Sequence, residues 1–277
     1  MRNIGRLSQN LFTYLGAGAL LVLLAGPLYW IVISSLKPSK EVISRVPTFF
    51  PHAPTLEHYI RLLQSRDFVS YLVNSTLVAV GTMGITLVLA TLAGYSTYRL
   101  KFKGQRLVAH LILVTYAFPG TLLLVPVYRM MSSLGLVDNL WSLVIVNVTF
   151  AAPFAVWLLR GFFEAVPWEL EEAASIDGAG PLRALTQIIL PLVAPGMATI
   201  AIYAFLVSWT EFMFASTLIM SDANKTLPMG LQAILAQYNV NWGALSAAAT
   251  VTTLPALALF TLIGRHFVKG LTAGAIK

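Results

Sequence analysis

The sequence predicts an all-α membrane protein with six transmembrane helices in a single domain. Three observations support this fold class: 57% of the 277 residues are hydrophobic, only 10% are charged, and the apolar residues form long continuous runs. Soluble domains carry about 25% charged residues, so the apolar surface of this chain must face lipid or other membrane helices. A transmembrane barrel strand would be about ten residues of alternating polarity, a pattern that these runs do not show.

Six apolar runs are long enough to cross a bilayer, which takes about 20 residues. Charged residues mark their ends, and Glu211 interrupts the fifth run. The first run follows Arg2 and Arg6, but it exceeds the apolar region of about 7–15 residues in a signal peptide, so we interpret it as a retained helix. The predicted spans are residues 11–33, 74–97, 107–128, 140–159, 191–219 and 244–267.

Basic residues set the predicted orientation. The net charge is +7, and the cations lie in short polar gaps between the spans. Arg99, Lys101, Lys103 and Arg106 form the densest cluster, and cytoplasmic loops carry such an excess of Lys and Arg. This predicts a multi-pass membrane protein with both termini in the cytoplasm. The same placement argues against nucleic-acid binding, which a positive charge would suggest in a soluble chain.

The sequence lacks the patterns expected of a catalytic or metal site. It has no cysteine, its four histidines are scattered, and no GxxxxGK[ST] phosphate loop occurs. The chain is therefore predicted not to be an enzyme, to hold no metal ion or cofactor, and not to bind ATP through such a loop.

The polar segment between the fourth and fifth spans is predicted to contain a short helix. Pro167 suits the first turn of a helix because its missing N–H would find no partner there. Three glutamates follow, near the positive end of the helix dipole, and Gly178 supplies a stop. Ala173 and Ala174 form a small-residue face that another protein could approach closely. Pro181 is expected to start a second helix.

This segment resembles the EAA motif of bacterial ATP-binding-cassette importer permeases. Every fixed position of the motif is present at the family's spacing, before the penultimate span. The matching residues are Glu172, Ala173, Ala174, Gly178, Ile188, Leu190 and Pro191. The resemblance implies a type I importer permease architecture, in which this loop forms a cytoplasmic coupling helix that docks on a separate ATPase subunit. It also implies a location in a bacterial-type cytoplasmic (inner) membrane. From the residues alone, a helix lying on the membrane surface is the alternative.

Weaker motifs resemble the carbohydrate branch of this family, in particular the second permease of maltose-type importers. They cover residues 34–38, 74–75, 208–212 and 269–276, and Thr210 stands where the branch has Asn. The resemblance implies a second permease subunit, two ATPase subunits that bind the ATP, and an extracytoplasmic sugar-binding protein as partners. It also implies that residues 222–241 reach into the binding protein. The candidate contacts in that loop are Gln232, Gln237, Tyr238, Asn239 and Asn241.

The expected solute is a neutral di- or oligosaccharide, because no Arg or Lys lies deep in the spans to neutralise a buried anion, and Arg265 stands at the cytoplasmic end of the sixth. Sugars need aromatic faces and uncharged hydrogen-bonding groups. The candidate pathway residues are Glu211, Trp209, Asn147, Tyr203 and Tyr116, with Phe150 and Phe154 as further candidates. Ordinary helix packing or an interfacial aromatic belt is the alternative for the aromatic residues.

Glu211 is the only acidic residue inside a predicted span. Carboxylates in a membrane are costly and usually face a cavity or a partner, so either a pathway role or a structural hydrogen-bonding role fits Glu211. Two other functions also stay open. One is an importer permease for another solute, such as a glycerol phosphodiester or a polyamine. The other is a secondary transporter or channel, which would need an ion or proton relay.

Overall fold

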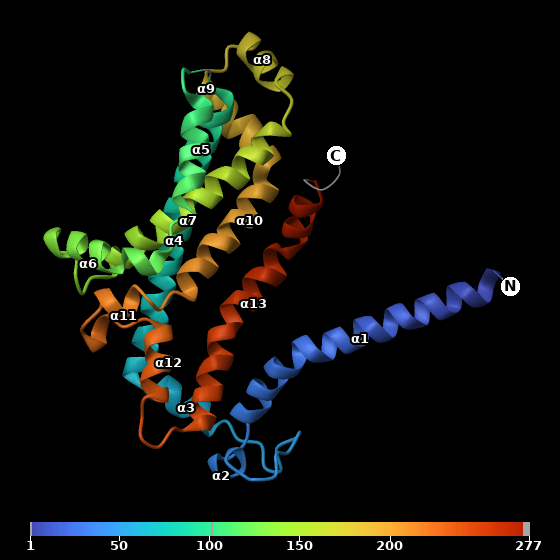
Figure 1. Cartoon of the computed structure of the whole chain (residues 1–277), viewed down its shortest axis with the longest axis vertical. Helices are drawn as coiled ribbons and strands as arrows, with labels where there is room; N and C mark the ends of the chain where they lie inside the picture. The colour runs from blue at the N-terminus through green and yellow to red at the C-terminus, as the bar shows by residue number, and fades with distance from the viewer. Residues whose placement is uncertain (1, 101, 274–277) are drawn as a thin grey trace. The chain divides into compact units, whose positions relative to one another are not determined.

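The computed structural model describes residues 2–100 and 102–273, with side-chain positions for residues 13–100 and 102–262. Within this part of the chain all regular structure is helical, as the sequence predicts (Figure 1). Lys101 of the predicted basic cluster and the end of the 269–276 motif lie outside the described residues.

The helices differ widely in length. Those described are α1 (Arg2–Ser35), α2 (Ser39–Val42), α3 (Glu57–Gln64), α4 (Arg66–Arg99), α5 (Gln105–Thr115), η1 (Gly120–Leu123), α6 (Leu124–Ser133), α7 (Leu140–Glu164), α8 (Glu169–Ile176), α9 (Pro181–Ala184), η2 (Leu185–Ile189), α10 (Leu190–Trp209), α11 (Ala215–Leu218), η3 (Asp222–Asn224), α12 (Leu227–Leu235) and α13 (Trp242–Ala273). By length and composition, five of the described helical stretches can cross a membrane, or six if a bent pair counts as one span.

The chain forms two compact units. The first comprises residues 1–69 and 231–254, and the second comprises residues 70–230 and 255–277, as far as these are described. In the first unit, Lys37 is 2% exposed, its ammonium donates to the Thr48 carbonyl, and its Nζ lies 4.6 Å from the centre of the Trp30 ring. His58 Nε2 lies 3.0 Å from the Lys37 carbonyl oxygen. These contacts hold the loop that follows α1.

In the second unit, α7 and α10 pack along each other and α5 packs against α7 (Figure 1). One buried apolar cluster joins α4, α7 and α10 and includes Leu159, Phe163 and Ile189. A second cluster joins α7 to α6 and α11 and includes Leu143 and Leu218. The first cluster lies next to the loop between α7 and α10, which contains the predicted coupling segment.

The third predicted span, residues 107–128, is not one continuous helix. Instead, α5 ends at Thr115, and the helical segment 120–133 that follows is bent away from it by 88°. Pro119 explains the break because it disfavours helical backbone at the preceding residue and lacks an N–H. The next residue, Gly120, permits close packing there: an added Cβ would lie 3.4 Å from Met213 Cε and 3.6 Å from the Phe150 ring.

The fifth predicted span, residues 191–219, differs from the structure at both ends. The helical run starts at Pro181, passes through the π-helical segment η2, and ends at Trp209. Pro191 cannot donate to the carbonyl four residues earlier, and the wider π turn accommodates its ring at that point. Glu211 therefore lies in a turn beyond the helix rather than inside it.

Candidate functional site

The predicted coupling segment forms a short helix whose C-terminal end is closed by hydrogen bonds. Gly178 follows α8 with a φ of +81°. The Ala179 N–H donates to the Ala174 carbonyl at 2.9 Å, and the Gly178 N–H donates to the Ser175 carbonyl at 3.1 Å. These bonds form a Schellman motif, which requires a left-handed residue that glycine adopts without strain. The prediction of a short helix stopped by Gly178 is confirmed.

One face of α8 is open to a partner. Glu172 and Ala173 are exposed, whereas Ala174 is buried against the bundle. Ile176 is 86% exposed, although an isoleucine is usually buried. Sequence reasoning missed Ile176; its signal was an apolar residue one helical turn after Glu172, on the same face. The exposed face therefore combines a carboxylate, a small residue and an apolar tip.

The remaining motif residues lie on the helical run that leads into the bundle. Pro181 occupies the first turn of α9, as predicted. Ile188 belongs to η2, and Leu190 and Pro191 begin α10. Ile188 and Leu190 are half-buried, and Pro191 is exposed. The structure thus divides the motif into an exposed helix and the entry of the next long helix.

Glu171 makes contacts that the helix dipole alone does not predict. Its Oε1 lies 3.0 Å from Arg99 Nε, and its Oε2 accepts a hydrogen bond from the Tyr95 hydroxyl at 3.2 Å. Arg99 is only 4% exposed. Arg99, a member of the predicted basic cluster, is therefore buried against α8 instead of standing free in the loop.

Two of the five predicted pathway residues lie in the packed interior of the second unit. Asn147 is 3% exposed, and its amide donates to Ser208 Oγ at 3.0 Å, to which Thr82 Oγ1 also donates at 3.4 Å. Trp209 is 2% exposed, and its ring stacks on Phe205 with centroids 5.2 Å apart. Asn147 therefore contributes to packing between α4, α7 and α10, whereas Trp209 is buried beside a residue of its own helix.

Tyr116 and Tyr203 instead meet in an aromatic cluster. The Phe154 ring lies 5.7 Å from Tyr116 and 4.7 Å from Tyr203, centroid to centroid, and 5.8 Å from Trp157. The two tyrosine hydroxyls are hydrogen-bonded to each other. Tyr116 is 52% exposed and Trp157 is 51% exposed. Tyr116, Phe154, Trp157 and Tyr203, hereafter the aromatic cluster, therefore form an open surface.

The aromatic cluster adjoins the break after α5. That helix has 11 residues, which corresponds to about 16 Å at 1.5 Å per residue, or roughly half of a hydrocarbon core of about 30 Å. If α5 begins at the inner surface, the backbone at residues 116–119 lies near mid-membrane. Non-helical backbone is tolerated at that depth only when it is buried in protein or lines a water-filled cavity. The break and the cluster together can line a transport pathway.

Glu211 lies at the turn between α10 and α11. Its Oε1 accepts the Phe214 N–H at 2.6 Å, and its Oε2 accepts the Ala215 N–H at 2.9 Å. The Phe214 ring packs against Phe150, with centroids 5.2 Å apart. Both carboxylate oxygens are thus engaged by the backbone, which supports the hydrogen-bonding role for Glu211. Phe150 is partly buried and packs against the second apolar cluster.

The predicted binding-protein loop is partly helical. Gln232 lies on α12, whereas Gln237, Tyr238 and Asn239 follow the helix and are exposed, Tyr238 completely. Asn241 has a different role, because its Oδ1 accepts the Ala244 N–H at 3.0 Å and caps the start of α13. Three of the five candidate contacts therefore remain on an exposed turn.

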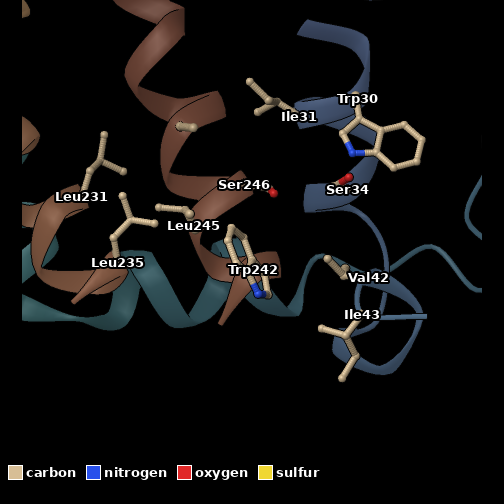
Figure 2. A pocket seen from close by; sticks show the side chains of 11 residues that line it. Trp30, Ile31, Ser34, Val42, Ile43, Leu231, Leu235, Trp242, Leu245 and Ser246 are labelled. Atoms are coloured by element: carbon tan, nitrogen blue, oxygen red, sulfur yellow. The ribbon is translucent and has the colours of Figure 1, made fainter. Parts of the chain in front are cut away.

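A cavity of about 770 Å³ lies within the first unit, and none of the predicted pathway residues is among those that line it. Figure 2 shows two indole rings and several aliphatic side chains around it, with Ser34 and Ser246 as hydroxyl-bearing members. The lining residues are Trp30, Ile31, Ser34, Val42, Ile43, Leu231, Leu235, Trp242, Leu245, Ser246 and Ala249. Such an apolar lining suits a lipid chain or an apolar helix better than a sugar.

Asp138 connects the α6–α7 loop to the segment after α11. Its backbone has a φ of 58°, which aspartate tolerates better than most residues. Its Oδ1 accepts the Met220 and Ser221 N–H groups at 3.0 and 2.9 Å and the Ser221 hydroxyl at 3.0 Å. The Ser221 and Met220 N–H donors hold the pKa of the Asp138 carboxyl below its usual range.

This pKa shift predicts an acid-sensitive contact. A carboxyl with a lowered pKa in the folded state stabilises that state fully above its unfolded pKa of about 3.9, and the stabilisation disappears as the pH falls through the lowered value. We expect Asp138→Asn to flatten this acid limb, because asparagine keeps the acceptor oxygen and the backbone conformation but does not titrate. Thermal midpoints in detergent between pH 7 and 3 check this, with exposed Asp222→Asn as the control. Parallel curves for Asp138→Asn and the wild type would contradict it.

The chain resembles known transport proteins. The family model described as binding-protein-dependent transport system inner membrane component matches residues 86–273. The chain is 35% identical to the sulfoquinovosyl glycerol transport system permease protein SmoH of Agrobacterium fabrum, over 95% of this chain and 93% of that protein. It is 34% identical to the trehalose transport system permease protein SugB of Mycobacterium tuberculosis, over 91% and 92% of the two chains.

A solved structure has the same fold. It is a chain of a bacterial ABC transporter involved in the import of the acidic polysaccharide alginate, with a TM-score of 0.82 and 22% identity. The match covers 94% of this chain and 98% of that chain. The likeness places the helices described above in a type I importer permease fold.

Proposed function

The chain belongs to the family of binding-protein-dependent transport system inner membrane components, and from this premise we propose that it is the permease subunit of an ATP-driven sugar importer. The proposed solute is a neutral di- or oligosaccharide. Relatives named for the transport of trehalose and of sulfoquinovosyl glycerol support a carbohydrate solute. Hydrolysis of ATP is assigned to a separate subunit, so this chain moves the solute without catalysing a reaction.

The aromatic cluster carries the proposal for the solute. Sugars present flat C–H faces and many hydroxyl groups, which aromatic rings and tyrosine hydroxyls can match without any charge. All four side chains of the cluster are uncharged, and Tyr116 and Trp157 are about half exposed. An anionic solute would require a cation beside it, because an unpaired buried charge is expensive. The cluster therefore fits a neutral sugar better than a phosphodiester.

The proposed partners are those of a complete importer. A second permease subunit completes the pathway, two ATPase subunits bind the ATP, and an extracytoplasmic sugar-binding protein delivers the solute. The exposed face of α8, with Glu172, Ala173 and Ile176, is the proposed ATPase contact. The exposed turn with Gln237 and Tyr238 is the proposed binding-protein contact. If both termini are cytoplasmic, the ATPase contact faces the cytoplasm and the binding-protein contact faces the outside.

The experiment is uptake by the complete complex. The chain is purified together with a second permease, an ATPase and a binding protein from the same organism and reconstituted in liposomes. We expect ATP-dependent uptake of a neutral oligosaccharide from a panel that also contains phosphorylated sugars, glycerol phosphodiesters and polyamines. Preference for a charged solute would contradict the proposed substrate class. Uptake driven by an ion gradient without ATP would contradict the importer and favour a secondary transporter.

Tyr203 provides the test of the pathway. We expect Tyr203→Ala to lower the apparent affinity for the sugar by about threefold to tenfold, since an aromatic contact contributes about 0.5–1.5 kcal/mol. Tyr203→Phe keeps the ring and should retain most of the affinity. Tyr14, which is 75% exposed on α1, supplies the control variant Tyr14→Ala. An unchanged concentration dependence for Tyr203→Ala would remove the aromatic cluster from the pathway.

A further inference from the structure

Arg99, the last residue of α4, lies at a junction of three helices in the second unit. Its Nη2 donates to the Phe163 carbonyl at 3.2 Å and to the Val166 carbonyl at 2.5 Å. Its Nε lies 3.0 Å from Glu171 Oε1 on α8. The Trp168 ring covers the guanidinium, with its centroid 4.3 Å from Arg99 Cζ. One side chain thus contacts the end of α7, the connecting loop and α8.

The chemistry of these contacts favours arginine over lysine. The carbonyls at the C-terminal end of a helix have no partner within the helix and favour a cation. Phe163 belongs to the last turn of α7, and its carbonyl accepts a hydrogen bond from Arg99. A planar guanidinium can donate in several directions and still stack on an indole ring, whereas the ammonium group of lysine acts as a single point charge. The side chain of Arg99 is 1% exposed, so water does not replace these contacts.

Few other features tie α8 to the bundle. The helix has eight residues, which is too short to be stable alone in water. Most of its side chains are exposed, and Ala174 is its buried member. Figure 1 shows α8 at one end of the bundle of α5, α7 and α10. The Arg99–Glu171 pair and the Tyr95–Glu171 hydrogen bond connect α8 directly to α4.

We propose that Arg99 is the positioning residue of the coupling helix and transmits its movement to the ends of α4 and α7. This inference rests on the proposed function of α8 as the ATPase contact. When the ATPase moves α8, the buried Arg99–Glu171 pair draws the end of α4 with it, while the bonds to Phe163 and Val166 hold the end of α7 in the same unit. Without Arg99, α8 moves with the ATPase but no longer moves the transmembrane helices.

The test compares uptake with hydrolysis in the reconstituted complex. We expect Arg99→Met to lower the number of sugar molecules imported per ATP hydrolysed by about tenfold, because the substitution removes the buried ion pair that links α8 to α4. Arg99→Lys should recover part of the ratio, because it restores the charge without the planar contacts. The matched control is Lys103→Met, which removes an exposed cation from the loop that follows Arg99. A structural defect alone would lower uptake and hydrolysis together and leave their ratio unchanged.

A distance measurement reports the position of α8 directly. The chain has no cysteine, so spin labels at Ser175→Cys and Arg106→Cys mark α8 and the start of α5 in a complex with cysteine-free partners. We expect the distance distribution to be narrow in the wild type and with Lys103→Met, and to broaden with Arg99→Met. An unchanged distribution together with a wild-type import ratio would overturn the proposal.

A second variant covers the case in which Arg99→Met fails to assemble. Glu171→Gln keeps the Arg99 contacts to the two carbonyls and removes only the ionic link to α8. It should broaden the distance distribution and lower the import ratio; wild-type values for both would overturn the proposal. Failure of the proposed function is distinguishable, because the wild-type complex would then import no sugar at all.

Discussion

Replacing Gly178 by valine is expected to abolish most transport while the chain still inserts in the membrane. Gly178 has a φ of +81°, and a Cβ built on it meets nothing within 4 Å. The cost is therefore backbone strain rather than a clash, about 1–2 kcal/mol for a residue with a side chain in the left-handed region. The Schellman motif then opens, α8 loses its defined end, and ATPase docking weakens. We expect uptake to fall by about tenfold or more.

Two further variants, one at residue 178 and one at residue 180, separate backbone strain from the other effects of adding a side chain. Gly178→Asn should retain most uptake, because asparagine tolerates the left-handed conformation. Gly180→Val should also be tolerated, since Gly180 has a φ of −69° and open space at its Cβ position. Two quantities are measured: the rate of sugar uptake, and the amount of ATPase subunit that copurifies with the chain. Wild-type values of both for Gly178→Val would show that α8 is not the docking helix.

Replacing Glu211 by alanine is expected to destabilise the chain and impair transport. The substitution leaves the Phe214 and Ala215 N–H groups without their acceptors, and an unsatisfied buried polar group costs about 1–3 kcal/mol. Glu211→Gln should be intermediate, because its amide supplies one acceptor oxygen while its NH₂ group faces a second N–H donor. The thermal midpoint in detergent and the uptake rate should therefore decrease in the order wild type, Gln, Ala.

The order of these effects distinguishes a structural role for Glu211 from gating. If the charge itself gates the pathway, Gln and Ala should impair uptake equally while both thermal midpoints stay at the wild-type value. Glu57→Gln is the control for charge removal, because Glu57 forms only an exposed surface pair with Arg61, which contributes little. Equal midpoints for wild type and Glu211→Ala would contradict the hydrogen-bonding role.

Local patterns in the sequence were sufficient for the helical fold class and for the coupling segment. Long apolar runs specify membrane helices without reference to neighbours, since their backbone groups must be satisfied within the helix. The short helix before Gly178 was likewise predictable, because its stop depends on one residue and the two backbone hydrogen bonds beside it. The break after α5 also had a local signal in Pro119, but the apolar run on both sides of it concealed the bend.

The roles of individual polar residues were decided only by the tertiary structure. Arg99 is a charged residue at the end of a span, and nothing in its neighbouring sequence specifies the backbone groups that it meets. The Arg99 partners on α7 and the following loop lie 64 and 67 residues away. The Asn147 amide donates to Ser208, which lies 61 residues further along the chain, so the role of Asn147 is to join two packed helices. A residue's type and local pattern determine that it needs a partner, whereas the packing of distant helices determines which partner it finds.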